Sequence, residues 1–371
     1  MCGKDVPYAG RMSVVLTVQG ARTADLVAGV SPLAELMACL HSIAEPEHHF
    51  EVRPWLTRVR AETSAGLQSR LNTYAPLWAR RRCRLLLPFG LPLGQSFEDE
   101  LWRIGQLPLD RFAVTAAEAI HGGLFDIGDL LGDEEAREAY VASCERRSFG
   151  RGELARHLVR DPGVFRADLL DVLRACAEEF FADEWARVAH RLESECTEVR
   201  ARVGALPVAE ALASLSPNAA ARQEPPSVVF DKLQSLHADL RGRRCLLVPS
   251  VHARPHLIVK VDPAFPVVVH FPVAGPAGGA RDTLAQVRLR LAILADPARL
   301  SLCRHLVNEP ITTSDLAART GMTLPQVSRH LARLREADLL ISRRDGRMVH
   351  HRLNLHRLMQ LGVDVLTTIM R

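Results

Sequence analysis

Two short helical segments joined by a tight glycine turn form the most constraining feature of this 371-residue chain. The first segment opens on Thr312-Thr313-Ser314-Asp315 and ends at Thr320-Gly321, where glycine is free to adopt a positive φ. The second opens on Thr323-x-x-Gln326, the spacing of a capping box, and Val327, Leu331 and Leu334 then recur as a stripe that one helix face would bury. Two helices of this length joined by a short glycine turn predict a helix-turn-helix.

The flanking sequence extends this prediction to a complete small domain. Leu284–Leu294 has the pattern of an amphipathic helix, and Asp296-Pro297 is a capping residue followed by proline, which predicts a further helix through Val307. Two strand-like runs, 339–342 and 348–353, flank the cationic turn Arg343-Arg344-Asp345-Gly346-Arg347. Such a hairpin after a helix-turn-helix predicts a wing, and a last helix is expected over 355–370.

The net charge of the chain changes sign near residue 280, where the predicted winged domain begins. Residues 281–371 hold 15 Lys+Arg and 8 Asp+Glu, a net charge of +7, whereas residues 1–280 carry a net charge of −3. A basic segment joined to a slightly acidic body is typical of a nucleic-acid-binding module attached to a second functional region.

Three stretches of the basic segment resemble the winged helix of ArsR/SmtB-type transcriptional repressors. They are Leu294-Ala295-Asp296-Pro297-Ala298-Arg299-Leu300, Asp315-Leu316-Ala317, and Val327-Ser328-Arg329-His330-Leu331-Ala332-Arg333-Leu334. One departure is Asp338, where the family usually has a glycine at the helix end; aspartate can occupy a left-handed cap at some cost. The region before it resembles an uncharacterised domain of regulators in high-G+C bacteria, through the strand at 13–18, the helix at Pro32–Leu40 and the run Cys245–Ser250. The resemblance does not assign a ligand to that domain.

The chemistry of DNA recognition selects the contact residues. The major groove admits one α-helix, and base edges pair with Arg, Gln, Ser and Thr side chains. We assign Gln326, Ser328 and Arg329 to base edges, although Gln326 could instead only close the capping box on Thr323. Leu324 or Pro325 could pack on a thymine methyl group. The wing arginines are assigned to phosphate or minor groove, with a solvated hairpin tip as the alternative. The predicted contact set is Thr323, Leu324, Pro325, Gln326, Ser328, Arg329, Arg333, Arg343, Arg344 and Arg347.

Two outer helices of the basic segment carry apolar stripes that predict a homodimer: Leu284, Val287, Leu291 and Leu294 on the first, and Leu358, Leu361, Val365 and Ile369 on the second. A domain of this size needs only part of that apolar surface for its own core. The resemblance agrees, since ArsR-like repressors pair through these two helices, and a two-fold dimer would require a near-palindromic operator. The alternative is that the stripes pack on the N-terminal region of the same chain. The expected dimer residues are Leu284, Val287, Leu291, Leu358, Leu361 and Val365.

The N-terminal region is expected to be mainly helical and then β-rich, so that the whole chain is α+β. We expect a strand at 13–18, helices at 21–44, 133–146 and 166–203, and β-rich runs at 228–230, 244–248, 257–261 and 267–271. The expected divisions are a flexible tail at 1–11, an N-terminal region at 12–274 with a sub-boundary near 205–227, a linker at 275–280, and the winged domain at 281–371.

Metal and enzyme signatures are not evident. The eight cysteines are scattered singly, which favours reduced thiols in the cytoplasm, and Cys303 is expected in the core of its helix. His350-His351 would point to opposite faces of a strand, His48-His49 is expected in solvent, and His252 with His256 is a weak ligand pair. We therefore expect no metal and no cofactor. Phosphate loops, nucleophile elbows and zinc-protease helices are also missing, so no catalytic residue is assigned.

Three functions remain open. The first is a non-metal DNA-binding regulator, expected to repress, whose N-terminal region senses an unknown small molecule or dimerises. In the second, that region binds a partner protein. In the third, it is an enzyme with an appended winged helix. A deep apolar pocket with convergent polar groups would favour the first over the second.

Overall fold

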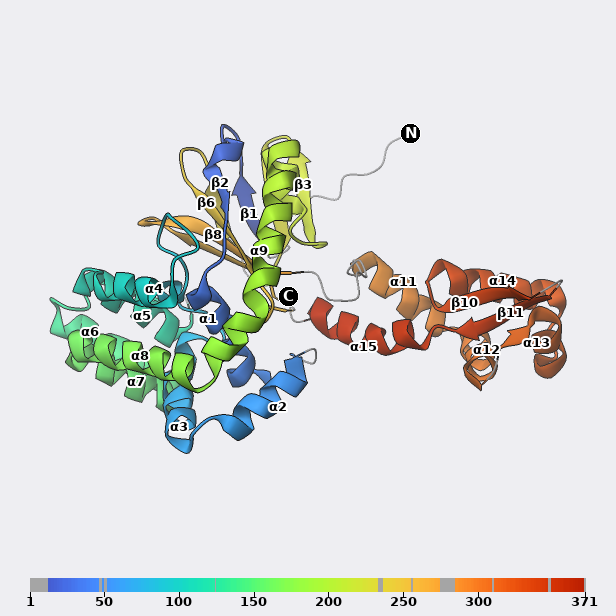
Figure 1. The fold of residues 1–371 in the computed structure, drawn as a ribbon, viewed down its shortest axis with the longest axis horizontal. Coiled ribbons are helices and arrows are strands. Elements are labelled where there is room, and N and C mark those ends of the chain that lie inside the picture. Colours follow the sequence, from blue (N-terminus) through green and yellow to red (C-terminus); the bar gives the residue numbers. More distant parts are fainter. Residues whose placement is uncertain are drawn as a thin grey trace. The chain divides into compact units, whose positions relative to one another are not determined.

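The computed structural model describes residues 13–46, 49, 52–123, 125–232, 236–254, 256–273, 284–308, 310–345 and 348–369. The chain divides into two compact units, Met1–Ala277 and Gly278–Arg371 (Figure 1). The tail expected at 1–11 and the linker expected at 275–280 lie outside the described residues.

The N-terminal unit combines a helical part with two sheets. Its helices are α1 (Pro32–Ala44), α2 (Arg53–Glu62), α3 (Ala65–Tyr74), α4 (Phe97–Gly105), α5 (Leu109–His121), α6 (Glu134–Arg147), α7 (Phe149–Arg160), α8 (Pro162–Cys176), α9 (Ala182–Ala205) and α10 (Val208–Ala213). Its strands are β1 (Ser13–Thr17), β2 (Leu26–Ala28), β3 (Ala219–Gln223), β4 (Pro226–Asp231), β5 (Leu236–Asp239), β6 (Cys245–Ser250), β7 (Ile258–Asp262) and β8 (Phe265–Pro272). Together with the winged unit, this confirms the α+β class.

One sheet separates two hydrophobic cores. Its order is β2-β6-β8-β7, and the other sheet runs β3-β4-β1-β5. Along β6, Leu246 and Val248 join the core of the helices, whereas Cys245 and Leu247 join the core shared with the second sheet. β6 pairs in parallel with both β2 and β8, and strands covered on both faces read as continuous apolar runs. Burial on both faces explains why the apolar runs at 244–248 and 267–271 predicted the strands β6 and β8.

Helix α1 lies at the centre of the helical core, and every residue from Pro32 to Ser42 is buried. Ser31 caps it by accepting a hydrogen bond from the backbone N–H of Ala34 at 3.1 Å. The helix expected over 21–44 is therefore too long. Residues 23–25 form a 3₁₀ turn and β2 follows, because Leu26–Ala28 find a parallel partner in β6.

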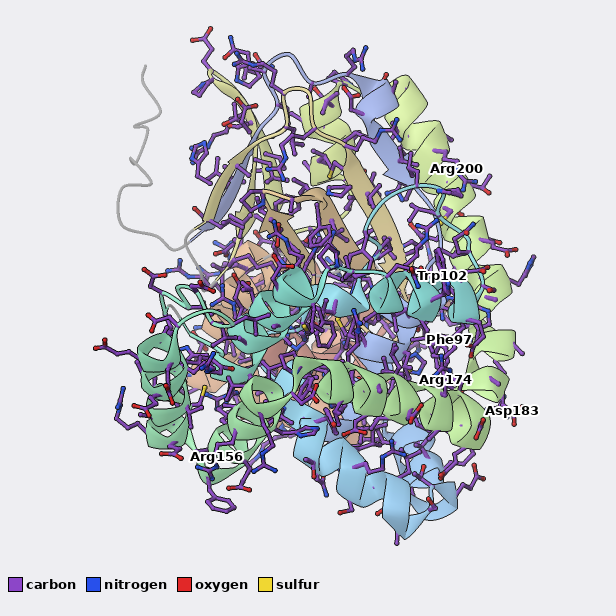
Figure 2. The ribbon with its side chains drawn as sticks, turned by 90° about the vertical axis from the view of Figure 1, so that its left-hand side faces the viewer. Phe97, Trp102, Arg156, Arg174, Asp183 and Arg200 are labelled. Atoms are coloured by element: carbon purple, nitrogen blue, oxygen red, sulfur yellow. The ribbon has the colours of Figure 1, made fainter. Side chains whose placement is uncertain are left out.

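The long helix expected over 166–203 is present as α8 and α9, joined by a π-helical turn at Ala177–Phe181. Side chains on it reach other elements of the unit (Figure 2). Arg200 donates to the carbonyl of Ala28 at 3.0 Å, and Arg174 pairs with Glu98 of α4 at 3.4 Å. Strands β3 and β5 were not predicted, because short polar runs such as Ala219–Gln223 carry no apolar alternation.

The C-terminal unit is a winged helix. Its elements are α11 (Leu284–Leu294), α12 (Pro297–Asn308), β9 (Ile311–Thr312), α13 (Thr313–Thr320), α14 (Leu324–Glu336), β10 (Leu340–Asp345), β11 (Met348–Leu353) and α15 (Leu355–Ile369). The strands form one sheet in the order β10-β11-β9. Asp338 adopts φ 59°, the left-handed cap expected after α14, and its carboxylate accepts from Arg357 Nε at 2.7 Å. None of the helices described in either unit is long and apolar enough to cross a membrane.

Candidate nucleic-acid interface

The first turn of α14 is closed by a reciprocal cap. Thr323 Oγ1 accepts from the backbone N–H of Gln326 at 3.4 Å, and Gln326 Oε1 accepts from the backbone N–H of Thr323 at 2.8 Å. In the single chain, Gln326 therefore closes the capping box on Thr323, which was the alternative to a base contact. Its side-chain oxygen is engaged, so the amide nitrogen is the group that it can still offer to a base.

The two faces of α14 differ sharply. Val327, Leu331 and Leu334 are at most 2% exposed and belong to the core of the unit. Arg333 forms an ion pair with Glu336 at 2.8 Å, in which both side chains are at least half exposed. All seven positions of α14 and its cap that were predicted to contact DNA are exposed: Thr323, Leu324, Pro325, Gln326, Ser328, Arg329 and Arg333. The helix therefore presents one exposed face, which is polar except for Leu324 and Pro325.

A glycine cap ends α13, and a buried histidine of the wing contacts the start of the same helix. Gly321 ends α13 with φ 71°, the left-handed conformation predicted for it. His351 of β11 is buried, and its ring nitrogens contact the hydroxyls of Thr313 at 3.1 Å and Ser342 at 2.9 Å. Burial also lowers the pKa of His351. This histidine therefore links α13 to the hairpin.

The wing itself is the β10–β11 hairpin. Arg343 lies opposite His350 and Arg344 opposite Val349 in its register, and both arginines are exposed. Arg347 lies outside the described residues. Exposed apolar side chains, Met348 and Val349 among them, accompany the cations.

The predicted dimer residues fall into two groups. Val287 and Leu361 are already buried in the single chain, and Leu284, Leu358 and Val365 are half-buried, whereas Leu291 is 45% exposed. Arg290 of α11 donates to the carbonyl of Ala337 at 2.8 Å, which anchors that helix to the end of α14. Sequence reasoning placed Ile369 on the apolar stripe of α15 but missed Met359, Gly362 and Leu366, which together with Ile369 form a more exposed face with the spacing i, i+3, i+7 and i+10. That face, called the outer face of α15 below, consists of Met359, Gly362, Leu366 and Ile369.

Comparison with known proteins identifies both units. Residues 12–277 match the family described as "Family of unknown function (DUF5937)". The chain belongs to this family. Residues 294–343 match the model described as "Helix-turn-helix domain". Within this DUF5937 protein, the winged helix carries an ArsR-type helix-turn-helix, as the resemblance implied, and the chain is a DNA-binding transcriptional regulator.

Named relatives match the winged unit. The HTH-type transcriptional regulator KmtR of Mycobacterium tuberculosis is 34% identical over 91 residues, which cover 24% of this chain and 70% of the relative. The arsenical resistance operon repressor of Escherichia coli is 42% identical over 66 residues, which cover 17% of this chain and 56% of the relative. A solved homodimeric winged helix-turn-helix DNA-binding domain from Mycobacterium bovis is 28% identical, covers 23% of this chain and 89% of its own, and has a TM-score of 0.20.

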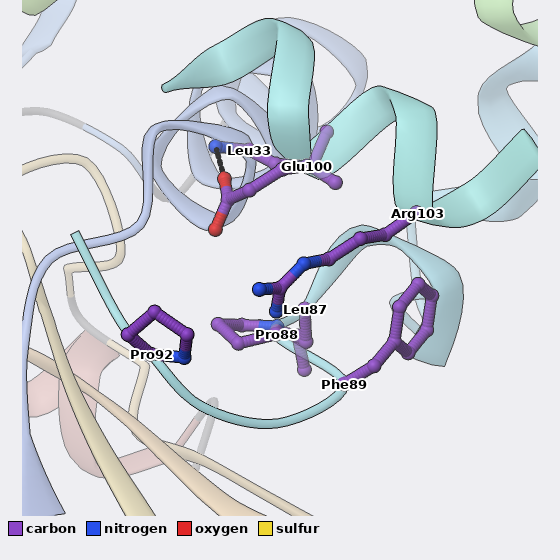
Figure 3. A pocket seen from close by; sticks show the side chains of 7 residues that line it. All are labelled: Leu33, Leu87, Pro88, Phe89, Pro92, Glu100 and Arg103. Atoms are coloured by element: carbon purple, nitrogen blue, oxygen red, sulfur yellow. Dashed lines mark hydrogen bonds between the residues drawn. The ribbon is translucent and has the colours of Figure 1, made fainter. Parts of the chain in front are cut away.

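The N-terminal unit contains a small cavity beside the start of α1 (Figure 3). The volume that the centre of a water molecule can reach inside it is about 10 Å³, which is room for about one water, whereas ligand pockets usually hold about 300–1,000 Å³. Glu100 Oε2 accepts from the backbone N–H of Leu33 at 2.8 Å, and burial raises the pKa of this carboxyl to about 7. The Arg103 side chain also lines the cavity. This cavity does not meet the criterion of a deep apolar ligand pocket.

A buried polar cluster in the same unit was not predicted. His252 Nδ1 lies 2.7 Å from Glu35 Oε1, and His252 Nε2 lies 3.4 Å from Glu184 Oε1. Burial alone lowers the pKa of His252, but the adjacent Cys39 sulfur and the two carboxylates more than offset it, so this pKa lies well above its usual value. Burial opposes ionisation of Glu35 and Glu184, yet their contacts with His252 leave both pKa values lowered. A charged triad, Glu35–His252–Glu184, therefore lies inside the protein.

Proposed function

We propose that this regulator binds a specific operator by inserting α14 into the major groove and that it acts as a repressor. The observation that carries the proposal is the exposed polar face over the first turns of α14, above an apolar stripe that fixes the helix to its core. The net charge of +7 on residues 281–371 supports binding to a polyanion.

Individual roles follow from the contacts of the described residues. Arg329 and Ser328 read base edges, because both are exposed near the N-terminal end of α14 and neither is part of the cap. Gln326 keeps the capping box closed and can offer its amide nitrogen to a base, and Leu324 or Pro325 contacts a thymine methyl. Thr323 supports the cap. Arg333, with Arg343, Arg344 and Arg347 of the wing, contacts phosphate and positions the helix without specifying sequence.

The regulator also works as a homodimer on a near-palindromic operator. Support comes from the outer face of α15, where Met359 is 79% and Ile369 is 63% exposed. Apolar side chains in a row of this kind mark an interaction surface. The interface then centres on this face and Leu291, with Leu284, Leu358 and Val365 at its margin. Val287 and Leu361 support it from below, because they are already buried in the single chain.

The N-terminal unit regulates the winged unit through a small molecule or through oligomerisation, with the boundary at the linker 275–280. No catalytic residue is assigned to this unit.

Arg329→Ala tests the recognition helix. Operators are first selected from random duplexes by the purified wild-type protein, and the affinity of the variant is then measured for each single-base change of the selected site. Removing a base-reading arginine is expected to cost about 1–3 kcal/mol of discrimination at one base position.

Arg335→Ala is the matched control, since Arg335 is an exposed arginine in the last turn of the same helix. It is expected to preserve discrimination at every base. If Arg329→Ala keeps the full discrimination of the wild type, this placement of α14 in the groove is wrong.

A further inference from the structure

Three histidines from separate segments of the N-terminal unit meet in its interior. His41 lies in the last turn of α1, His49 between α1 and α2, and His256 in the connection from β6 to β7. One ring nitrogen of each lies within 4.8 Å of those of the other two. The ring centroids are 4.9, 5.1 and 5.6 Å apart, and the ring planes are inclined to one another by 67–81°. We call this group the histidine triad.

The backbone of each histidine is held in a turn. The carbonyl of His41 accepts from the N–H of Glu45 at 2.9 Å. The N–H of His49 donates to the carbonyl of Pro46 at 3.2 Å, and the N–H of His256 donates to that of Ala253 at 2.7 Å. The triad is therefore assembled by three anchored turns.

A further contact orients the ring of His41. Its Nδ1 lies 3.0 Å from the carbonyl oxygen of Trp78, and a carbonyl can only accept, so Nδ1 carries the proton. The lone pair of a neutral ring is then on Nε2. Histidines that bind metals nearly always donate their other ring N–H in this manner, often to a backbone carbonyl.

We propose that His41, His49 and His256 bind one divalent transition-metal ion, and that this ion is Zn²⁺. Imidazole nitrogen suits zinc, copper, nickel and iron, whereas magnesium and calcium prefer oxygen ligands. Zn–N bonds of about 2.0–2.1 Å in a tetrahedron place ligand nitrogens about 3.3 Å apart, so the triad needs to contract by no more than about 1.5 Å.

The three histidines differ in their exposure. His41 and His49 are 3% and 2% exposed, but His256 is only half-buried. Three protein ligands with an open fourth position taken by water or a small anion are typical of accessible zinc sites, whereas structural sites are closed by four protein ligands. Binding would join the end of α1 to the β6–β7 connection, two segments that are distant in sequence.

The neighbouring Glu35, Cys39 and His252 also lie within ligand distance of one another, yet they suit a metal less well. Glu35 Oε1 already accepts from the backbone N–H groups of Val251 and His252, each at 3.2 Å, and contacts the His252 ring. Burial raises the pKa of the Cys39 thiol to about 11, which disfavours the thiolate that a metal requires. The charged triad and the histidine triad thus have separate roles, the first holding its own charges and the second holding a cation.

The test uses the full-length protein, freed of metal with a chelator and titrated with Zn²⁺ in a calorimeter and with Co²⁺ by visible absorption. One equivalent of each is expected to bind, and the cobalt complex should show the intense visible bands of a four-coordinate ion. His49→Gln and His256→Gln should each weaken zinc binding by more than about tenfold. His190→Gln, which removes an exposed histidine of α9, is the control and should leave the affinity unchanged.

X-ray absorption of the zinc-loaded wild type keeps the test decisive even if a variant fails to fold. The expected spectrum has imidazole nitrogens at about 2.0 Å and no sulfur. Absence of stoichiometric binding by the wild type, equal affinity in folded His49→Gln and His256→Gln variants, or a sulfur ligand at about 2.3 Å would each overturn the proposal.

Discussion

The two units place their polar chemistry in opposite locations. In the winged unit the side chains proposed to contact DNA lie on the surface of one helix and one hairpin. In the N-terminal unit the most unusual polar groups, the charged triad and the histidine triad, lie in or beside the core and come from segments more than 200 residues apart. The site on the surface of the winged unit should therefore respond to salt concentration, whereas the clusters inside the N-terminal unit should respond to pH and to substitutions that leave a buried charge without its partner.

The largest effect is expected from breaking the charged triad. Glu35→Gln removes one carboxylate from the buried His252 cation, and a buried charge that loses a partner typically costs about 3–5 kcal/mol. The free energy of unfolding is measured by urea titration followed by tryptophan fluorescence, with a chelator present. All four tryptophans, at 55, 78, 102 and 185, lie in the N-terminal unit, so the signal reports that unit alone.

Glu98→Gln is the matched control, because Glu98 forms an ion pair with Arg174 while its side chain is 65% exposed. A loss of less than about 1 kcal/mol is expected there. If both variants lost the same free energy of unfolding, the buried Glu35–His252 pair would be no more stabilising than the exposed Glu98–Arg174 pair, contrary to the prediction.

The same triad predicts how stability depends on pH. The pKa of His252 is raised by folding, so its contribution is complete below about pH 6.5 and is lost as the pH rises from there through the folded value. The pKa values of Glu35 and Glu184 are lowered, so their contribution is complete above about pH 4.5 and is lost as the pH falls below it. Urea midpoints between pH 3.5 and 8.5 should peak in the window between these limits, and Glu35→Gln should flatten the peak. A wild-type profile that is flat across this window would contradict the charged triad.

The sequence predicted the winged unit well because its signals are local. The cap of α14, the glycine at 321 and the left-handed Asp338 each depend on a few neighbouring residues, and all were found where expected. The histidines were misjudged for the opposite reason. His49 was expected in solvent but is 2% exposed, because its environment is created by α1 and the β6–β7 connection rather than by its neighbours in sequence. His48 lies outside the described residues.

The winged unit also carries the surface through which two copies of the chain are proposed to pair, the outer face of α15. Leu366→Glu with Ile369→Glu places two charges in each half of the apolar contact, and the dissociation constant should rise at least about 100-fold, or about 2.7 kcal/mol. Sedimentation velocity at micromolar concentrations measures the change. His356→Glu with Arg352→Glu, exposed positions of α15 and β11 outside that face, should leave the dimer intact. A wild-type chain that stays monomeric and binds a single half-site would refute the dimer.

The smallest effect is expected from the wing, and it should appear as a change in salt dependence rather than in stability. Arg343→Gln, Arg344→Gln and Arg347→Gln together should weaken all duplexes alike. Each phosphate contact contributes about 0.9 to the slope of log affinity against log salt, so three lost contacts reduce the slope by about 2.7. Between 50 and 200 mM salt, the wild type would then lose about 40-fold more affinity than the variant.

A control removes the same charge elsewhere, through Arg60→Gln, Arg146→Gln and Arg160→Gln on exposed positions of the N-terminal unit. If net charge alone governed binding, both triple variants would change the slope equally. If the wing arginines contact phosphate, only the wing variant changes it, and the tryptophan-monitored unfolding of the N-terminal unit stays the same in that variant. A slope unchanged by the wing substitutions would leave the hairpin tip as solvated surface and assign the phosphate contacts to α14 alone. In the proposed function, charge in the wing acts through contact with DNA, whereas charge in the charged triad acts through burial.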